Sequence, residues 1–241
     1  MKEWIYGKNM VVEAIRAGKI ENEVILQQGM QDVKLLELLK KHHLKVVYQN
    51  KAYFKKVLGD VRSQGIMAQI EGYDYVELED LLMKQPRGKF PLYVMLDGLE
   101  DPHNLGAILR TADAIGVDGI IIGKNRSVSL NSTVAKVSTG AIEYVPVCQV
   151  TNLSRTLERL KKEGFWVVGT DMQDAVDYRQ VDYNMPLVIV IGSEGFGISR
   201  LVLEKCDYKV TLPMIGHVTS LNASVACAIM LYEVHNGRNP L

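Results

Sequence analysis

The sequence predicts an α/β protein with a small N-terminal unit and a larger unit built on a parallel sheet. Apolar residues recur at helical spacing in some segments and in short continuous runs in others, and the two kinds of segment alternate. The run 188–191 is apolar at every position, which is typical of a strand buried on both faces of a parallel sheet. Near 84–91, two prolines and a glycine stand among basic residues and indicate the end of a linker.

The N-terminal unit, residues 1–72, alternates between helix and strand. Apolar residues from Met10 to Ile15 lie at helical spacing, and Gly18 ends that helix. Helices alternating with strands predict a small α/β sandwich. The expected helices are 9–17, 33–40 and 51–58, and the expected strands are 24–26, 45–48 and 66–70.

Residues 73–89 are expected to link the units, with a short separate segment at 78–83, and the larger unit occupies 90–241. In parallel sheets, ligands bind at the carboxyl ends of the strands, so functional residues are expected just after them. The expected strands are 92–96, 119–122, 145–150, 166–170, 187–191 and 208–212, and the expected helices are 105–115, 133–140, 153–162, 223–234 and a short turn at 198–203.

The composition is that of a globular protein and excludes several classes. The chain has 241 residues, is 47% hydrophobic and carries 28 Lys and Arg against 28 Asp and Glu, so it is not a basic polyelectrolyte. The cysteines Cys148, Cys206 and Cys227 stand far apart, which argues against a disulfide framework or structural zinc, and we expect no metal. No apolar run approaches the roughly 20 residues that span a bilayer. The first residues lack a signal-peptide core, so we expect a cytoplasmic protein without a membrane segment.

Charge is divided unevenly between the units. Residues 1–72 contain 12 Lys and Arg against 8 Asp and Glu, an excess of +4, while the remainder contains 16 against 20. This asymmetry is either a chance property of a solvated surface or the mark of an RNA-facing module joined to a near-neutral catalytic body.

Three loops of the larger unit could carry chemistry, and the first follows the strand at 92–96. It is polar and leads into a helix, with Asn104 at an expected N-cap position and Arg110 on the flank of the apolar stripe. Taken alone, Asn104 is a plain helix cap and Arg110 forms a surface pair with Asp113.

The second loop follows the strand at 187–191 and contains Gly192, Gly195 and Gly197. Glycine there lets the backbone approach a ligand closely, although a flexible turn is the alternative. The glycine spacing and the late position differ from the dinucleotide-binding fingerprint, which disfavours a nicotinamide-dependent oxidoreductase.

The third loop runs from Pro213 to Asn222, which can cap the last helix, and it includes Ser220. The first residues of that helix are nearly all small, which permits close packing on the sheet or a self-association surface. No G-x-S-x-G or H-E-x-x-H motif and no convincing carboxylate pair is present.

Together, in this order, the three loops resemble the three motifs of the SpoU/TrmH family of RNA ribose 2′-O-methyltransferases, within the SPOUT superfamily. The resemblance covers about 90–241, and residues 1–72 look like the ribosomal-protein-like substrate-binding domain often joined to this catalytic domain. It implies an α/β domain with a deep trefoil knot that binds S-adenosylmethionine, works as a homodimer and acts on RNA.

The resemblance also implies roles for individual residues. Gly192, Leu212 and Leu221 would lie at the cofactor, with Thr170 and Gly195 nearby. Arg110 would either deprotonate the ribose hydroxyl, as proposed for the family, or clamp the neighbouring phosphate and stabilise developing oxygen charge. The residues expected to order the loops and position the ribose are Asn104, Glu194, Ser220 and Asn222.

The subgroup that resembles the chain most methylates a guanosine of 23S ribosomal RNA. A transfer-RNA guanosine and a ribosomal-RNA adenosine, whose methylation confers antibiotic resistance, are the alternative targets. A non-catalytic RNA-binding assembly factor is the alternative of a different class.

Overall fold

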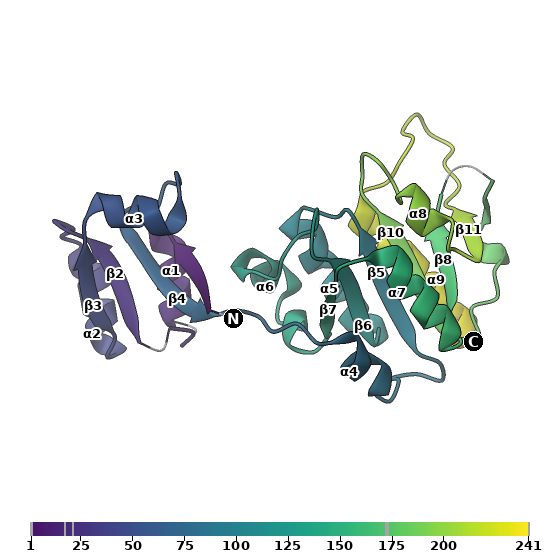
Figure 1. The fold of residues 1–241 in the computed structure, drawn as a ribbon, viewed down its shortest axis with the longest axis horizontal. Coiled ribbons are helices and arrows are strands. Elements are labelled where there is room, and N and C mark those ends of the chain that lie inside the picture. Colours follow the sequence, from purple (N-terminus) through teal and green to yellow (C-terminus); the bar gives the residue numbers. More distant parts are fainter. Residues whose placement is uncertain (1, 17, 21, 172–173, 241) are drawn as a thin grey trace. The chain divides into compact units, whose positions relative to one another are not determined.

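The computed structural model describes residues 2–16, 18–20, 22–171 and 174–240. The chain divides into two compact units, residues 1–74 and 75–241 (Figure 1). None of the described helices has the combination of length and apolar character that a bilayer crossing requires.

The first unit is a sheet with helices on both faces. Strands β1, β4 and β2 are antiparallel neighbours, and β3 pairs parallel with β2 at the edge. One apolar cluster lies under α1 and α2, and a smaller one, centred on Phe54, lies under α3. Its elements are β1 (Lys2–Tyr6), α1 (Lys8–Arg16), β2 (Glu23–Gln27), α2 (Val33–Lys41), β3 (Lys45–Gln49), α3 (Lys51–Leu58) and β4 (Ile66–Glu71).

The described strands of the second unit form one parallel sheet in the order β7-β6-β5-β10-β8-β11-β9. Its strands are β5 (Leu92–Asp97), β6 (Gly119–Gly123), β7 (Val147–Val150), β8 (Trp166–Thr170), β9 (Val176–Asp177), β10 (Leu187–Gly192) and β11 (Tyr208–Thr211). Its α-helices are α4 (Leu78–Met83), α5 (Pro102–Ile115), α6 (Ser132–Ser138), α7 (Leu153–Lys162), α8 (Arg200–Leu203) and α9 (Ala223–Arg238), and its 3-10 helices are η1 (Ala141–Glu143) and η2 (Tyr178–Gln180).

Central strand β10 is buried at every position, as its continuous apolar run predicts. Helices α4, α7 and α8 contribute to the core on one face, while α5 and α9 pack against each other on the other (Figure 1). The guanidinium of Arg238 donates to the carbonyl oxygens of Phe90 (2.7 Å) and Met185 (2.7 Å). These bonds hold the end of α9 against the starts of β5 and β10. Helix α9 therefore continues to Arg238, beyond the expected 223–234.

Several elements differ from the sequence expectation. Strand β1, which was not expected, pairs along its whole length with β4. The segment expected to link the units, 73–89, carries helix α4, which buries Leu78 and Leu81 in the core of the second unit. The first expected helix was to reach residue 17, which lies outside the described residues.

Helix α5 begins earlier than expected. Asp101 is its N-cap and accepts a hydrogen bond from the backbone of His103, and Pro102 occupies the first turn. The expectation that Asn104 is the cap was therefore wrong, because the Asp-Pro pair supplies a cap acceptor and a preset first helical residue three positions earlier. Asn104 lies inside the first turn and is buried, which leaves its amide available for other contacts.

Candidate active site at the carboxyl edge of the second sheet

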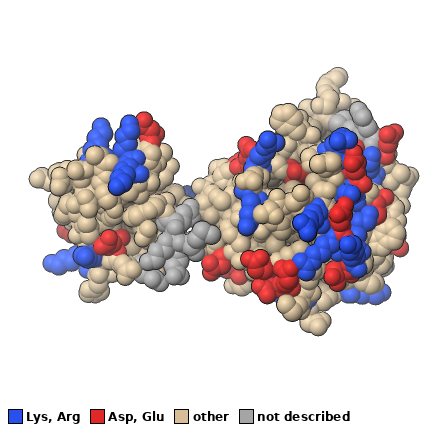
Figure 2. Space-filling model, viewed as in Figure 1, with Lys and Arg blue, Asp and Glu red and all other residues tan. Residues whose placement is uncertain are grey.

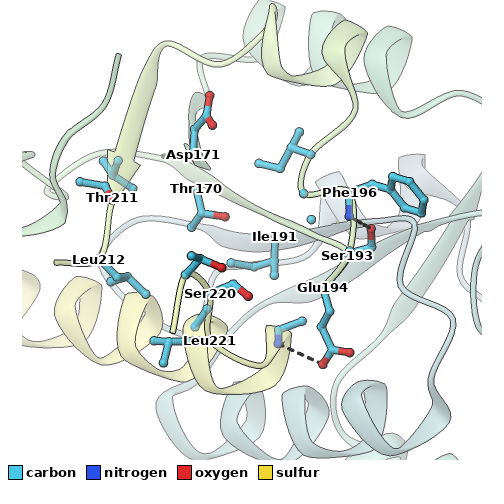
Figure 3. A pocket seen from close by; sticks show the side chains of 18 of the residues that line it. Thr170, Asp171, Ile191, Ser193, Glu194, Phe196, Thr211, Leu212, Ser220 and Leu221 are labelled. Atoms are coloured by element: carbon cyan, nitrogen blue, oxygen red, sulfur yellow. Dashed lines mark hydrogen bonds between the residues drawn. The ribbon is translucent and has the colours of Figure 1, made fainter. Parts of the chain in front are cut away.

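A cavity of about 440 Å³ lies where β8, β10 and β11 end. The loop after β10 forms one wall and the segment between β11 and α9 forms the other (Figure 3). This is the edge at which parallel sheets bind ligands. The lining residues are Thr170, Asp171, Ile191, Gly192, Ser193, Glu194, Gly195, Phe196, Gly197, Ile198, Leu203, Val210, Thr211, Leu212, Met214, Thr219, Ser220, Leu221, Ala223 and Ala226.

The loop after β10 is a closed turn held by its own backbone. Ser193 and Gly197 exchange two backbone hydrogen bonds of 3.1 and 2.9 Å. A Cβ atom on Gly192 would lie 2.0 Å from the carbonyl carbon of Gly197, so only glycine lets the chain fold back this closely. Gly197 also has a positive φ of 65°, which glycine adopts without strain.

A neighbouring strand fixes the far end of this turn. The carboxylate of Asp97, the last residue of β5, accepts a hydrogen bond of 2.8 Å from the backbone of Ser199. Because β5 and β10 are parallel neighbours, their ends meet at one edge of the sheet. Asp97 thus anchors the loop although it lies 102 residues away in sequence.

Three side chains from the three predicted loops form one hydrogen-bonded cluster beside the cavity. Asn104 donates to Glu194 Oε1 (3.0 Å), and Asn222 donates to the same oxygen (2.5 Å) and to Asn104 Oδ1 (2.9 Å). Asn222 also caps α9, accepting from the backbone of Ser224 and Val225. The cap therefore fixes the amide of Asn222 where it can hold the carboxylate of Glu194.

The structure places most of the expected site residues at this edge. Glu194 and Ser220 line the cavity, and Asn104 and Asn222 join Glu194 in the cluster. All five residues expected at a cofactor also line the cavity: Thr170, Gly192, Gly195, Leu212 and Leu221.

Arg110 is the exception. It is exposed on α5 and does not line the cavity. It lies six positions after Asn104, so at about 100° per residue the two side chains leave the helix in different directions. Asp113, the expected surface partner of Arg110, pairs instead with Arg87 at 3.2 Å.

Sequence reasoning missed several residues at the site. Asp97 could have been suspected because it directly follows an apolar strand. Ser193, Phe196 and Met214 line the cavity without a local pattern that singles them out.

The lining suits a small organic ligand with both apolar and polar parts. Ile191, Leu212 and Leu221 provide apolar surface, while Thr170 and Ser220 provide hydroxyl groups. Cys206 lies behind this edge, close to Gly169, and burial raises the pKa of its thiol to about 12, so it is not a thiolate nucleophile at neutral pH. No group of three potential metal ligands was found among the described residues.

Comparison with known proteins gives family matches over both units. Residues 91–232 match the SpoU rRNA Methylase family, and residues 4–76 match the family described as RNA 2′-O ribose methyltransferase substrate binding.

Full-length relatives are similar throughout. YacO of Bacillus subtilis (strain 168) is 48% identical over 244 residues, and its name places it in the TrmH family of tRNA/rRNA methyltransferases. The alignment covers 99% of this chain and 97% of YacO. A relative from Staphylococcus aureus (strain COL), named for the same family, is 50% identical over 238 residues, covering 98% and 96%.

Solved structures share the fold. An AdoMet-bound rRNA methyltransferase from Sinorhizobium meliloti is 25% identical with a TM-score of 0.64, covering 98% of this chain and 87% of that one. The A. aeolicus TrmH/SpoU tRNA modifying enzyme is 34% identical with a TM-score of 0.59, covering 67% and 80%.

Proposed function

Because this chain belongs to the SpoU rRNA methylase family, we propose that it is an S-adenosylmethionine-dependent methyltransferase acting on the ribose 2′-hydroxyl of an RNA nucleotide. The observation that carries the proposal is the cluster of Asn104, Glu194 and Asn222, which joins all three predicted loops beside one cavity. A binding protein without catalysis has no need to hold a carboxylate at the cavity with two amide side chains from distant loops.

The cavity fits the cofactor by its chemistry. Gly192 and Gly195 let backbone N–H and C=O groups line the wall, where they can bind the polar atoms of a purine and an amino acid. Leu212 and Leu221 offer apolar surface for the face of the purine ring, and Thr170 lies nearby. When bound, the cofactor supplies an electrophilic methyl group on a sulfonium.

The remaining task is to orient a weakly acidic hydroxyl. Glu194, fixed by two asparagine amides, gives the cavity mouth a rigid acceptor, and Ser220 adds a hydroxyl on the opposite wall. We assign Arg110 to the RNA, where its guanidinium clamps the phosphate beside the target ribose and stabilises charge on the attacking oxygen. Orientation of this kind contributes several kcal/mol to rate acceleration.

The proposal includes a trefoil knot and a homodimer in the domain at 90–241. After β11, on the outer side of β8, the chain returns past the loop after β10 to reach α9, which packs on α5. That path supports a knot formed by the second and third loops. The exposed side chains of Val225 and Tyr232 on α9 support a second copy of the chain docked on this helix pair.

Residues 1–72 serve in this proposal as the RNA-binding domain. Figure 2 shows basic side chains gathered over α3, which carries Lys51, Lys55 and Lys56. An extra basic module suits a structured RNA recognised by shape and backbone, and we propose a guanosine of 23S ribosomal RNA as the target. An RNA substrate of this kind places the activity in the cytoplasm.

Mapping ribose methylation in cells that lack the protein tests the proposal. Ribosomal and transfer RNA from the deletion strain and its parent would be compared at every 2′-hydroxyl. We expect one guanosine of 23S ribosomal RNA to lose its methyl group and to regain it when the gene is restored. Loss of a methyl group at a transfer-RNA nucleotide or a ribosomal adenosine instead would identify that nucleotide as the target. An unchanged methylation map would refute the activity.

A further inference from the structure

Phe196 stands out among the residues at the cavity. Its side chain is 96% exposed, although it lies in the wall of the cavity, between Gly195 and Gly197. Single exposed apolar side chains are common, so the exposure of Phe196 alone does not indicate a function. Its location does indicate one, because a large aromatic ring at the mouth of an active site can contact a substrate that enters it.

The ring is presented on a rigid support. Ser193 and Gly197 close the turn with two backbone hydrogen bonds, and the backbone N–H of Phe196 donates to Ser193 Oγ at 3.4 Å. A phenylalanine has only two side-chain torsions, so little conformational entropy is lost when it binds a partner. The turn therefore holds an aromatic platform in a defined place.

The ring points out of the cavity. In Figure 3 it faces away from Thr170 and Thr211, and the side chain of Glu194 extends from the same turn in another direction. Only Gly195 separates Phe196 in sequence from Glu194, whose carboxylate is held by Asn104. The cavity thus lies behind the ring, and the turn that carries the ring also carries Glu194 of the proposed ribose-binding cluster.

We propose that Phe196 is a positioning residue that stacks on the base of the methylated nucleotide. This inference rests on the proposed function. A nucleotide whose 2′-hydroxyl reaches an enclosed site leaves its neighbouring bases, and the unstacked base needs a new apolar face. Its base lies close to its 2′-hydroxyl, and Phe196 lines the same cavity as Glu194, so its exposed ring can supply that face. Aromatic stacking of this kind is sequence-tolerant, so Phe196 contributes to orientation and leaves base identity to other contacts.

Steady-state methylation with four full-length proteins tests this role: wild type, Phe196→Leu, Phe196→Trp and Leu201→Ala. The methyl acceptor is total RNA from cells that lack the protein. Phe196→Leu keeps the apolar volume but removes the π-face, and we expect its kcat/KM for RNA to fall roughly tenfold, chiefly through KM. Phe196→Trp should restore the wild-type KM. Leu201→Ala, which truncates a 57% exposed side chain on α8, should change KM less than twofold.

Two further measurements separate stacking from other roles. S-adenosylmethionine affinity, measured by calorimetry, should be unchanged in both Phe196 variants, and the tryptophan emission of Phe196→Trp should be quenched by RNA beyond the change seen in wild type. A wild-type KM in Phe196→Leu, a weakened cofactor affinity or a changed oligomeric mass would each overturn the stacking role. If wild type itself neither binds the cofactor nor methylates RNA, the proposed function has failed and the inference fails with it.

Discussion

The two units of the chain are both α/β sandwiches, yet they present their functional groups in different ways. In the second unit the groups lie at the ends of strands, where Gly192 allows the backbone to fold back on itself and distant loops meet. In the first unit the notable groups are lysines on the outer surface of α3. The path of the chain therefore brings together the groups of the second unit, whereas the lysines of the first unit lie on one helix.

Arg110→Ala gives the largest effect expected within the second unit. In the proposed mechanism its guanidinium stabilises charge at the reacting oxygen, so the substitution should lower methyl transfer by about 1,000-fold. The affinity for S-adenosylmethionine should stay within about twofold of wild type, since Arg110 does not line the cavity. Single-turnover methylation and calorimetry measure the two quantities. Full activity in this variant would remove Arg110 from the mechanism.

Glu194→Gln tests whether the hydrogen-bonded cluster orders the site. The carboxylate accepts from two asparagine amides at one oxygen, and a neutral amide makes weaker bonds there. We expect kcat to fall roughly 30-fold, which corresponds to about 2 kcal/mol. The matched control is Glu204→Gln, which removes a carboxylate paired with Arg200 on the surface of α8. Equal effects of the two substitutions would show that the cluster has no special role.

Reversing charge on the first unit should give the smallest of these effects, and the effect should be on KM for RNA. Replacing Lys51, Lys55 and Lys56 with glutamate should raise KM for RNA about tenfold at low salt, with the difference shrinking as salt rises. Cofactor affinity should be unchanged. Methylation assays across a salt series check this prediction, and the same changes at Lys40 and Lys41 of α2 measure the contribution of charge in general. A salt-independent loss would mean that the lysines act through folding.

The sequence predicts the strands of the second sheet well because buried parallel strands are continuous apolar runs. Strand β1 has no such pattern, since it is short and begins with two charged residues, and its pairing with β4 joins opposite ends of the first unit. Strand β9 has two residues, too few for any periodic pattern. Helix α4 looked like part of a linker because its burial depends on a distant core.

The site was predicted in its location more than in its contacts. Residues such as Gly192 and Leu221 were expected at one cofactor site because the three loops resemble the SpoU/TrmH motifs. The hydrogen bonds of Asn104 to Glu194 and of Asp97 to Ser199 span 90 and 102 residues, and no local pattern encodes them. Arg110 was expected at the site from its motif position, but that position did not reveal that its side chain lies outside the cavity.

Calorimetric titration of S-adenosylmethionine into wild type, Gly192→Ala and Gly216→Ala tests the central claim most directly. An added Cβ on Gly192 meets the backbone of Gly197 at 2.0 Å, whereas one on Gly216 meets nothing within 4 Å. We expect wild type and Gly216→Ala to bind one cofactor per chain with similar affinity, and Gly192→Ala, checked for folding by circular dichroism, to bind at least about 30-fold more weakly. Absence of binding by wild type, or wild-type affinity in a folded Gly192→Ala protein, would show that this cavity is not the cofactor site.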